Sequence, residues 1–582
     1  MTPAEVRNTF LHDKLRELNL TQVPLTLLQP DDHTYTAAFL QPEGVIDATT
    51  NAIQNADPVL ANAKHSQFLR TAYDLGVDLA ITPEYSCPWD ALLQSIDNRI
   101  LPTPGQLWVV GCESITPDQM NQLTNVNRSA RWVIAETEPT GTKRFLDPLC
   151  YVLWAENANE ERELVVAVQY KGQPMSDHGH NLERDYMVKG RERFILRNDE
   201  NSIFLTTLIC SDSLDFVYTQ LPDHVHTPYL ILHPQLNRKP RYNAFKEYRC
   251  NAYLKSDIQE FICVNWAKGF RLPQGHPSEF GGSAYYLKTE SLPPHDNRLN
   301  EDHRNGLYYT IVPDNQSHIF FFNYCEGVFQ FRTTKASQAG VMRVLQNRTG
   351  PEMIQIFSWD DAGQHWAPVR LVDDGFGALC NAVGRHLAPI SGNGLTMIEK
   401  ERLLALCGGS FIRSDRGFWM SPSRLESFYV KDDEVIKRFT FVQDPDTAAY
   451  DHRFRALGNF DRLRNNIIID AANFPPVMDD FAGDCTISYP INNRYEFNLL
   501  KSDGGKATVA FVGNCSLNRV DQTYDSLYDI LDDANDHVRD EQRRRLVVWY
   551  ERQGRILRKW DARSQVDKDL SADAVSIAKV VE

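Results

Sequence analysis

The chain has 582 residues, of which 42% are apolar and 24% charged, and its formal net charge is −16. A chain of this length usually divides into two or more domains, and the composition is ordinary for a globular protein. The acidic balance disfavours general binding of nucleic acid, and no apolar run approaches the roughly 18 residues of a membrane span.

The cysteines and the first residues bear on where the protein works. Eleven cysteines are spread along the chain without a CxxC pair, which argues against a disulfide framework or a zinc ribbon. Residues 1–20 are polar and amphipathic and lack the apolar core of a secretory signal. Together these features predict a cytoplasmic, reducing environment.

Apolar runs alternate with helical patterns through the first part of the chain. Residues 56–75 show helical spacing, with Gly76 as a stop signal, and residues 243–258 also have helical character. The expected strands are residues 35–41, 77–81, 107–110, 151–154, 164–170, 203–210, 229–232 and 261–265. The alternation predicts a layered α/β domain.

The character of the chain changes beyond about residue 331. The small, polar stretch 333–340 is expected to be a linker, which gives one domain at 1–335 and a second α+β domain at 341–582. The basic stretch 539–563 is expected to be a helix packed on its own domain, or alternatively one that contacts a protein or nucleic-acid partner. Expected helices cover 397–406 and 524–560, and strand-like runs cover 466–470, 494–500 and 506–512.

Three short motifs carry most of the chemical information. They are Pro83-Glu84, Tyr170-Lys171 and Cys210-Ser211-Asp212. Each places a carboxylate, an ammonium or a thiol at or just beyond the end of a strand-like run. Taken alone, each residue is typical of a structural role: a capping carboxylate, a solvated lysine, an inert core cysteine.

Taken together, the three residues provide the parts needed to cleave a C–N bond with a thiol. Cys210 is the candidate nucleophile, and Glu84 the base that takes its proton and returns it to the leaving amine. Lys171 and the backbone N–H of Ser211 are candidates to stabilise the oxyanion, a contribution of about 3–4 kcal/mol per donor. A nearby ammonium is also expected to lower the pKa of the thiol, and burial to raise the pKa of Glu84.

The order and setting of these motifs resemble the catalytic set of the nitrilase superfamily, the carbon–nitrogen hydrolases. Secondary matches extend the resemblance over about residues 35–332 and comprise Val109-Val110-Gly111-Cys112-Glu113, Glu183 to Gly190, Asn265 with Gly269, and Phe280 to Ala284. The resemblance implies that Glu183 orients Lys171 and helps to position the substrate. It also implies a four-layer α-β-β-α sandwich that pairs into a homodimer or a higher homo-oligomer.

The chain departs from the family pattern near two of the motifs. Lys171 is followed by Gly172-Gln173-Pro174 instead of an apolar His-Leu pair, and the loop carries His178 and His180 without an evident third metal ligand. No metal or cofactor is therefore expected. Cys210 is followed by Ser-Asp instead of the Trp-Glu usual in nitrile-cleaving members, which favours an amide or carbamoyl bond. Candidate pocket walls are Tyr85, Trp89 and His178.

The resulting prediction is a cysteine-dependent hydrolase of a non-peptide C–N bond in a small amide-like substrate, acting through a thioester. Two alternatives stay open: an inactive scaffold that dimerises a partner-binding C-terminal domain, and an amidotransferase or acyltransferase. Residues 391–394 lack the SGGxDS phosphate loop that glutamine-dependent NAD synthetases carry beside this hydrolase. The missing membrane spans likewise exclude apolipoprotein N-acyltransferases.

Overall fold

The computed structural model describes residues 6–30, 34–126, 129–175, 181–238, 248–249, 251–252, 258–272, 282–288, 307–312, 317–335, 338–339, 342–343, 350–369, 375–383, 407, 447–487, 498–532 and 545–560. The chain divides into two compact units, one inside residues 1–372 and the other mainly inside residues 373–582. The first unit combines α-helices with two large mixed sheets. Its extent places the expected boundary at residue 335 within the unit, not at its end.

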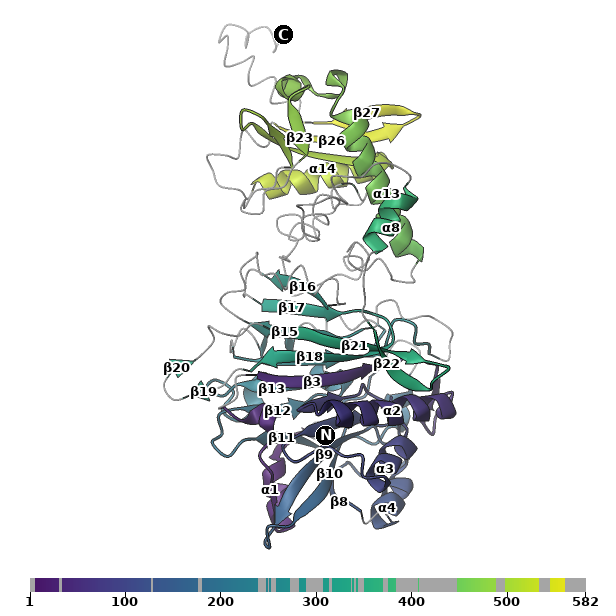
Figure 1. Cartoon of the computed structure of the whole chain (residues 1–582), viewed down its shortest axis with the longest axis vertical. Coiled ribbons are helices and arrows are strands. Elements are labelled where there is room, and N and C mark those ends of the chain that lie inside the picture. The colour runs from purple at the N-terminus through teal and green to yellow at the C-terminus, as the bar shows by residue number, and fades with distance from the viewer. Residues whose placement is uncertain are drawn as a thin grey trace. The chain divides into compact units, whose positions relative to one another are not determined.

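One sheet of the first unit includes β3, β18, β21 and β22 (Figure 1). Glu84 and Lys171 lie just beyond the ends of two other strands of this sheet. Its order is β22-β21-β18-β3-β6-β7-β9-β10-β8, with β2 beside β9. In that order the strands are β22 (His365–Val369), β21 (Glu352–Asp360), β18 (Gly327–Thr334), β3 (Thr34–Gln41), β6 (Leu79–Ile81), β7 (Leu107–Gly111), β9 (Pro148–Asn157), β10 (Arg162–Tyr170), β8 (Arg131–Ile134) and β2 (Leu20–Gln22). Strands β6 and β7 are parallel, and β9 is antiparallel to both β7 and β10. Strands β6 and β10 therefore end at the same edge of the sheet.

The second sheet supplies the cysteine. Its order is β1-β11-β12-β13-β14-β15-β17-β16. In that order the strands are β1 (Arg7–Phe10), β11 (Glu192–Arg197), β12 (Phe204–Thr207), β13 (Tyr229–Pro234), β14 (Glu260–Val264), β15 (Ala284–Lys288), β17 (Ser317–Phe322) and β16 (Leu307–Val312). Strands β12, β13 and β14 run parallel to one another, so their carboxyl ends share one edge.

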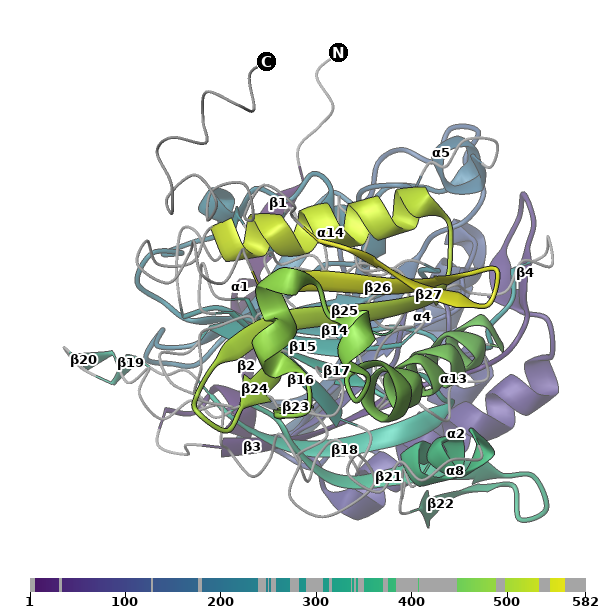
Figure 2. The ribbon, with the colours of Figure 1, turned by 90° about the horizontal axis from the view of Figure 1, so that it is seen from above.

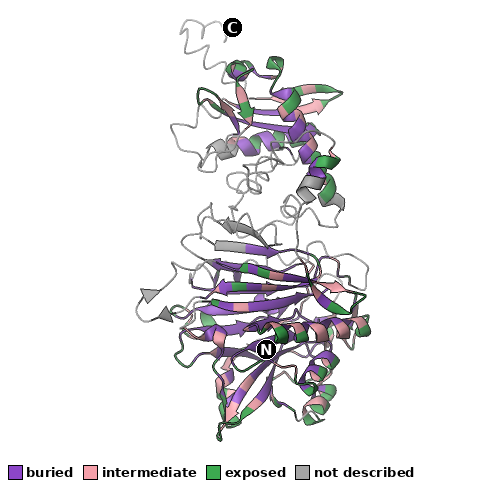
Figure 3. Cartoon of the chain, in the orientation of Figure 1, coloured by how far each residue is buried: buried purple, intermediate pink, exposed green. Residues whose placement is uncertain are grey.

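Side chains of the two sheets contact each other directly. Gln169 in β10 donates a hydrogen bond to the carbonyl oxygen of Thr207 in β12 at 3.0 Å, and it accepts one from the N–H of Phe194 in β11 at 2.8 Å. The rings of Phe39 in β3 and Phe322 in β17 meet edge to face with centroids 4.7 Å apart. Figure 3 shows that most residues of these strands are buried. The sheets therefore enclose a common core, which brings the ends of β6, β10 and β12 into one region.

Helix α2 (Pro58–Leu75) precedes β6 and confirms the helix expected at residues 56–75. Asp57 caps its first turn by accepting a hydrogen bond from the N–H of Leu60 at 3.0 Å, and Gly76 ends it in the left-handed conformation with a φ of 60°. Its buried side consists of Ala61, Lys64, His65, Phe68, Leu69 and Ala72. The smaller elements of this unit are α1 (Leu11–Glu17), η1 (Thr26–Leu28), β4 (Ile46–Ala48), β5 (Ile53–Asn55), α3 (Trp89–Asp97), α4 (Pro117–Val126), α5 (Leu182–Tyr186), η2 (Cys210–Ser213), η3 (Tyr218–Gln220), β19 (Gln338–Ala339) and β20 (Met342–Arg343).

The second unit is built on a sheet of order β23-β24-β25-β26-β27 (Figure 2). Strands β25 and β26 are parallel and are joined across α14, which packs against β26. Its strands are β23 (Cys485–Ile487), β24 (Leu499–Lys501), β25 (Lys506–Asn514), β26 (Leu546–Arg552) and β27 (Arg555–Lys559). Its helices are α8 (Gly375–Ala382), α13 (Thr447–Arg462), η7 (Leu463–Ile467), η8 (Ala471–Asn473), η9 (Pro476–Phe481) and α14 (Leu517–Asp532).

Two expectations for the second unit are wrong. The helix expected over residues 524–560 ends with α14, and residues 546–559 form the β26–β27 hairpin instead. The strand expected at residues 466–470 follows helix α13 as a continuation of helical turns. The expected helix 397–406 lies outside the described residues. Within the described part of the chain, no helix has the length and apolarity needed to cross a membrane.

Candidate functional site

Glu84 lies in the turn that follows β6, and it is 1% exposed. Its Oε2 atom accepts a hydrogen bond from the N–H of Leu236 at 2.6 Å, and its carbonyl oxygen accepts one from the Trp266 indole at 2.9 Å. The turn passes so close to β7 that a Cβ atom at Gly111 would lie 2.2 Å from the carbonyl oxygen of Pro83. The glycine that ends β7 therefore fixes the path of the turn that holds Glu84.

Lys171 directly follows β10 and directs its ammonium at Glu84. Its Nζ atom lies 2.6 Å from Glu84 Oε1 and 2.8 Å from each Glu183 carboxylate oxygen. An oxygen of a third carboxyl group, Asp147 Oδ2, lies 3.8 Å away. The backbone is held on both sides, since the Lys171 N–H donates to the Asp147 carbonyl at 3.0 Å and the Lys171 carbonyl accepts from Gly190 at 2.8 Å. Lys171 and Glu84 thus form a buried ion pair across 87 residues of sequence.

Glu183, in α5, is held from three directions. Its Oε1 atom accepts a hydrogen bond from the Tyr85 hydroxyl at 3.1 Å, and its Oε2 atom accepts one from the N–H of Met175 at 2.6 Å. The Tyr85 ring centroid lies 5.8 Å from Lys171 Nζ, within the range of a cation–π contact. Glu183 therefore fixes the direction of the Lys171 ammonium, and Tyr85 supports both.

Cys210 begins the 3₁₀-helix η2, three residues beyond β12, whereas the sequence places it at the end of the strand. Its φ of 41° is in the left-handed region, which costs about 1–3 kcal/mol for a non-glycine residue. Its carbonyl oxygen accepts hydrogen bonds from His233 Nε2 at 2.8 Å and from the Ser213 hydroxyl at 3.1 Å. The charges of Glu84, Lys171 and Glu183 all act on the pKa of the thiol, so the sulfur lies near all three. Carboxylate, ammonium and thiol are therefore brought together.

Asp212 ties the turn of the cysteine to the loop of the lysine. Its Oδ1 atom accepts hydrogen bonds from the N–H groups of Gly172 and Gln173, both at 2.8 Å. Its Oδ2 atom accepts one from the N–H of Ile209 at 3.2 Å. The carboxylate of the Cys-Ser-Asp motif thus has a structural role, because it sets the distance between two segments of the site.

Ser211 adds a second connection to the same loop. Its hydroxyl donates to the carbonyl oxygen of Gln173 at 2.6 Å, and its side chain is buried. Among the described residues, no acceptor is found for the backbone N–H of Ser211. A free N–H beside the sulfur is the feature that an oxyanion hole requires.

Burial dominates the electrostatics of the site. It raises the pKa of the Cys210 thiol well above its ordinary value, and the negative charge of Glu84 raises it further. Lys171 lowers the pKa of the thiol, as expected, but this effect is smaller than that of burial, so the pKa is raised in total. Burial also raises the pKa of Glu84 against the opposing effect of Lys171. Cys210 therefore rests as a protonated thiol, and its neighbour Glu84 is a stronger base than an exposed glutamate.

Lys171 keeps its charge in the same surroundings. Burial alone would lower the pKa of its ammonium, but the negative charges of Glu183 and Glu84 outweigh burial, and the pKa is raised well above its ordinary value. One carboxylate oxygen each from Glu84, Asp147 and Glu183 lies within 4.8 Å of the others, a spacing that could hold a metal ion. The Lys171 ammonium, within 2.6–3.8 Å of all three, is the cation among them.

One expected pocket residue, Trp89, does not join this cluster. The indole of Trp89, at the start of α3, donates to the carbonyl oxygen of Glu113 at 3.0 Å. His178 lies outside the described residues. The sequence analysis missed Asp147 and His233, and it assigned Asp212 no role. Asp147 precedes the apolar strand β9 instead of following a strand, so it lacks the signal that marked the other site residues.

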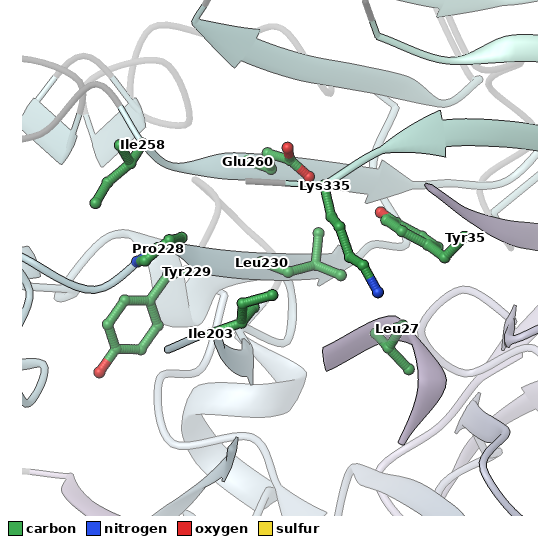
Figure 4. Close-up of a pocket in the computed structure, with 9 residues that line it drawn as sticks. All are labelled: Leu27, Tyr35, Ile203, Pro228, Tyr229, Leu230, Ile258, Glu260 and Lys335. Atoms are coloured by element: carbon green, nitrogen blue, oxygen red, sulfur yellow. The ribbon is translucent and has the colours of Figure 1, made fainter. Parts of the chain in front are cut away.

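A small hollow elsewhere in the first unit contains none of these residues (Figure 4). It is lined by Leu27, Tyr35, Ile203, Pro228, Tyr229, Leu230, Ile258, Glu260 and Lys335. The Lys335 ammonium there donates to the carbonyl oxygen of Thr26 at 2.7 Å. Glu84, Lys171 and Cys210 do not line this hollow, so the hollow has no part in their chemistry.

Comparison of the sequence with known proteins gives no independent assignment for the site. No known protein family matches the chain, and no curated protein matches it either. The interpretation of the cluster formed by Glu84, Lys171, Glu183 and Cys210 must therefore rest on the distances and charges described above.

Proposed function

We propose that the first unit is a cysteine-dependent hydrolase that cleaves a non-peptide C–N bond, of the amide or carbamoyl type, through a thioester. The observation that carries the proposal is the meeting of Glu84, Lys171 and Cys210 at the ends of β6, β10 and η2, in a buried cluster. A base near a thiol, beside a fixed ammonium, is the arrangement that nucleophilic acyl transfer needs.

The reaction begins with transfer of the Cys210 thiol proton to Glu84 as the sulfur attacks the carbonyl carbon. The oxyanion is stabilised by the Lys171 ammonium and the Ser211 N–H. An ammonium has three N–H donors, and one each for Glu84 and Glu183 leaves the third for the oxyanion. Glu84 then passes the proton to the departing nitrogen, which leaves as ammonia or an amine. Water, activated by Glu84, hydrolyses the thioester and restores the thiol.

The proposal extends to the architecture. The two sheets in contact support the inner pair of layers of an α-β-β-α sandwich, and α2 and α3 support a helical layer on one side. The residues expected to supply helix on the other side, 243–258, lie largely outside the described residues. A homodimer formed through such layers belongs to the same proposal, as do a cytoplasmic location and a protein partner for the second unit.

Release of ammonia from a panel of primary amides and N-carbamoyl amino acids tests the proposal. Wild-type protein is expected to release ammonia from at least one class, and Cys210→Ala to release none. Cys325→Ala is the matched control because Cys325 is an exposed cysteine of the same unit. Mass spectrometry after treatment with iodoacetamide should find label on Cys210 in the wild type.

The outcomes separate the alternatives. Full activity in Cys210→Ala removes the thiol from the mechanism. An intact protein whose Cys210 takes no label, while Cys325 does, identifies a non-catalytic scaffold. A product that forms only when a nucleophilic acceptor such as hydroxylamine is added, without free acid in its absence, identifies a transferase.

A further inference from the structure

Asp147 is a buried acid beside the proposed base, Glu84. It belongs to none of the three sequence motifs and has no role in the mechanism proposed above. It is 1% exposed and stands immediately before β9. Its carbonyl oxygen accepts the backbone N–H of Lys171, which fixes its place in the site. Neither of its side-chain oxygens accepts a hydrogen bond from any N–H or O–H group of the described residues.

An ionised carboxylate in that position would be strongly unfavourable. A buried charge is stable only when it is closely paired and hydrogen-bonded. The nearest ammonium, Lys171, lies 3.8 Å from Asp147 Oδ2 and is already bonded to Glu84 and Glu183 at 2.6–2.8 Å. Three carboxylates around one ammonium would leave two uncompensated negative charges in the interior. Like charges this close favour the uptake of a proton by one member of the group.

The geometry points to Asp147 as the group that takes up this proton. One oxygen of Asp147 lies within 4.8 Å of an oxygen of Glu84 and of an oxygen of Glu183, and neither Asp147 oxygen has a hydrogen-bond partner among the described residues. Burial and the charge of Glu84 raise the pKa of Asp147 well above its ordinary value. Two carboxylates cannot hydrogen-bond to each other, because both only accept, whereas a carboxylic acid can donate to a carboxylate. The titratable groups that face Asp147 from the surrounding elements are Glu84, Lys171, Glu183 and the Tyr85 phenol. Each of the others already has a described partner besides Asp147.

We propose that Asp147 is a positioning residue, held as a neutral carboxylic acid that donates a hydrogen bond to Glu84 and so keeps Glu84 ionised and aligned as the base. The inference rests on the hydrolase proposed above. Burial makes the Glu84 carboxylate prone to bind a proton, and the hydrogen bond from Asp147 opposes that tendency. Asp147 keeps its own proton throughout; the proton that moves in the reaction is that of Cys210.

The test is the pH dependence of Cys210 alkylation by iodoacetamide in the full-length protein. Glu84 must be ionised to take the thiol proton, so the rate should fall on the acid side as Glu84 becomes protonated. Asp147→Ala removes the donor, and the acid limb should move up by about one to two pH units, the value of a hydrogen bond to a charged group. Asp147→Asn keeps an N–H donor and should retain the wild-type limb. The exposed Cys325, measured in the same samples, is the reference.

The result that overturns the inference is an acid limb that coincides in Asp147→Ala and wild type, or one that moves equally in both variants. Failure of the proposed function gives a different result, since Cys210 in the wild type would then take no label at any pH at which Cys325 does. Should Asp147→Ala fail to fold, infrared spectroscopy decides. The carbonyl band of a buried neutral carboxylic acid should be present in wild type and absent in Asp147→Asn, and a wild type without the band refutes the inference.

Discussion

Replacing Lys171 with methionine removes the ammonium that contacts three buried carboxyl groups, while keeping most of the volume of the side chain. Lys171 and Glu84 are each 1% exposed, so solvent screens their interaction little. Removing one partner of a buried ion pair typically costs about 3–5 kcal/mol. The structure therefore predicts a loss of stability of this size in Lys171→Met at neutral pH.

The loss should depend on pH in a defined direction. Without the ammonium, the buried carboxyls bind protons more tightly in the folded protein than in the unfolded chain. A folded-state pKa raised in this way costs nothing below the ordinary pKa, and the cost grows as the pH rises above it. For a glutamate with an ordinary pKa of about 4.3, taking up one proton costs about 3.7 kcal/mol at pH 7 and about 1 kcal/mol at pH 5. The difference between variant and wild type should thus be several-fold smaller at pH 5.

Hydrogen exchange in increasing urea measures this difference locally. Peptides from β6 and β10, read by mass spectrometry, report on the first unit without a contribution from the second. Lys64→Met is the matched control, because the buried Lys64 pairs at 2.7 Å with a single carboxylate, Glu326. It should cost less than Lys171→Met. The reasoning is refuted if Lys171→Met unfolds at the wild-type urea concentration at pH 7, or if its loss is equal at pH 5 and pH 7.

Three further predictions concern the supports of the site and the second unit. Gly111→Ala should cost about 1–3 kcal/mol in urea unfolding and reduce Cys210 labelling, because the new Cβ would clash with the turn at Pro83. Gly458→Ala, in the middle of α13 with open space around it, should instead raise stability by about 0.5–1 kcal/mol. Burial lowers the pKa of His233 to about 3, below its unfolded value, so its contribution to stability is present above pH 6.5 and is lost as the pH falls. Wild type should lose about 2 kcal/mol from this group between pH 7 and pH 5, and His233→Gln should lack that part of the slope.

The amino-acid sequence predicted correctly those elements and site positions that residues close together in the chain determine. Strands β6 and β10 are apolar runs with clear ends, so the positions of Glu84 and Lys171 beyond them could be predicted. Helix α2 carries its own cap at Asp57 and its own stop at Gly76, and both act within one turn of the helix. Signals of this kind depend only on residues that are close together in the chain, so they can be recognised in the amino-acid sequence.

The contributions of Asp147 and His233 could not be predicted, because they depend on distances across the fold. The environment of Asp147 is unusual only because the fold places Lys171 and Glu84, which follow other strands, beside it. His233 supports Cys210 across 23 residues through the carbonyl oxygen, an atom that every residue has. No pattern of residue types marks such a contact.

The error over residues 524–560 has a different cause, since a local signal was present and was outweighed. Gln553 and Gly554 both adopt positive φ, at 52° and 75°, as a two-residue hairpin turn between antiparallel strands requires. Leu546 to Tyr550 are β-branched, aromatic or aliphatic, which favours a strand. The alternation of basic and apolar residues from 539 to 563 suits a helix equally well, and the Gln-Gly pair should have decided between the two.

For the proposed hydrolase, the charges of the site explain how a thiol that rests protonated could act as the nucleophile. Burial raises the pKa of Cys210 and of Glu84 together, so the acid and the base that exchange the proton are shifted in the same direction. The pKa of Lys171 is raised as well, but for a lysine a raised pKa favours the charged form, which Glu183 and Glu84 stabilise. In the proposed mechanism a free thiolate therefore never has to accumulate, because the proton moves to Glu84 as the sulfur attacks an electrophile. An amide or carbamoyl group would in addition develop negative charge on its oxygen during the attack, and this is the charge that the Lys171 ammonium would stabilise.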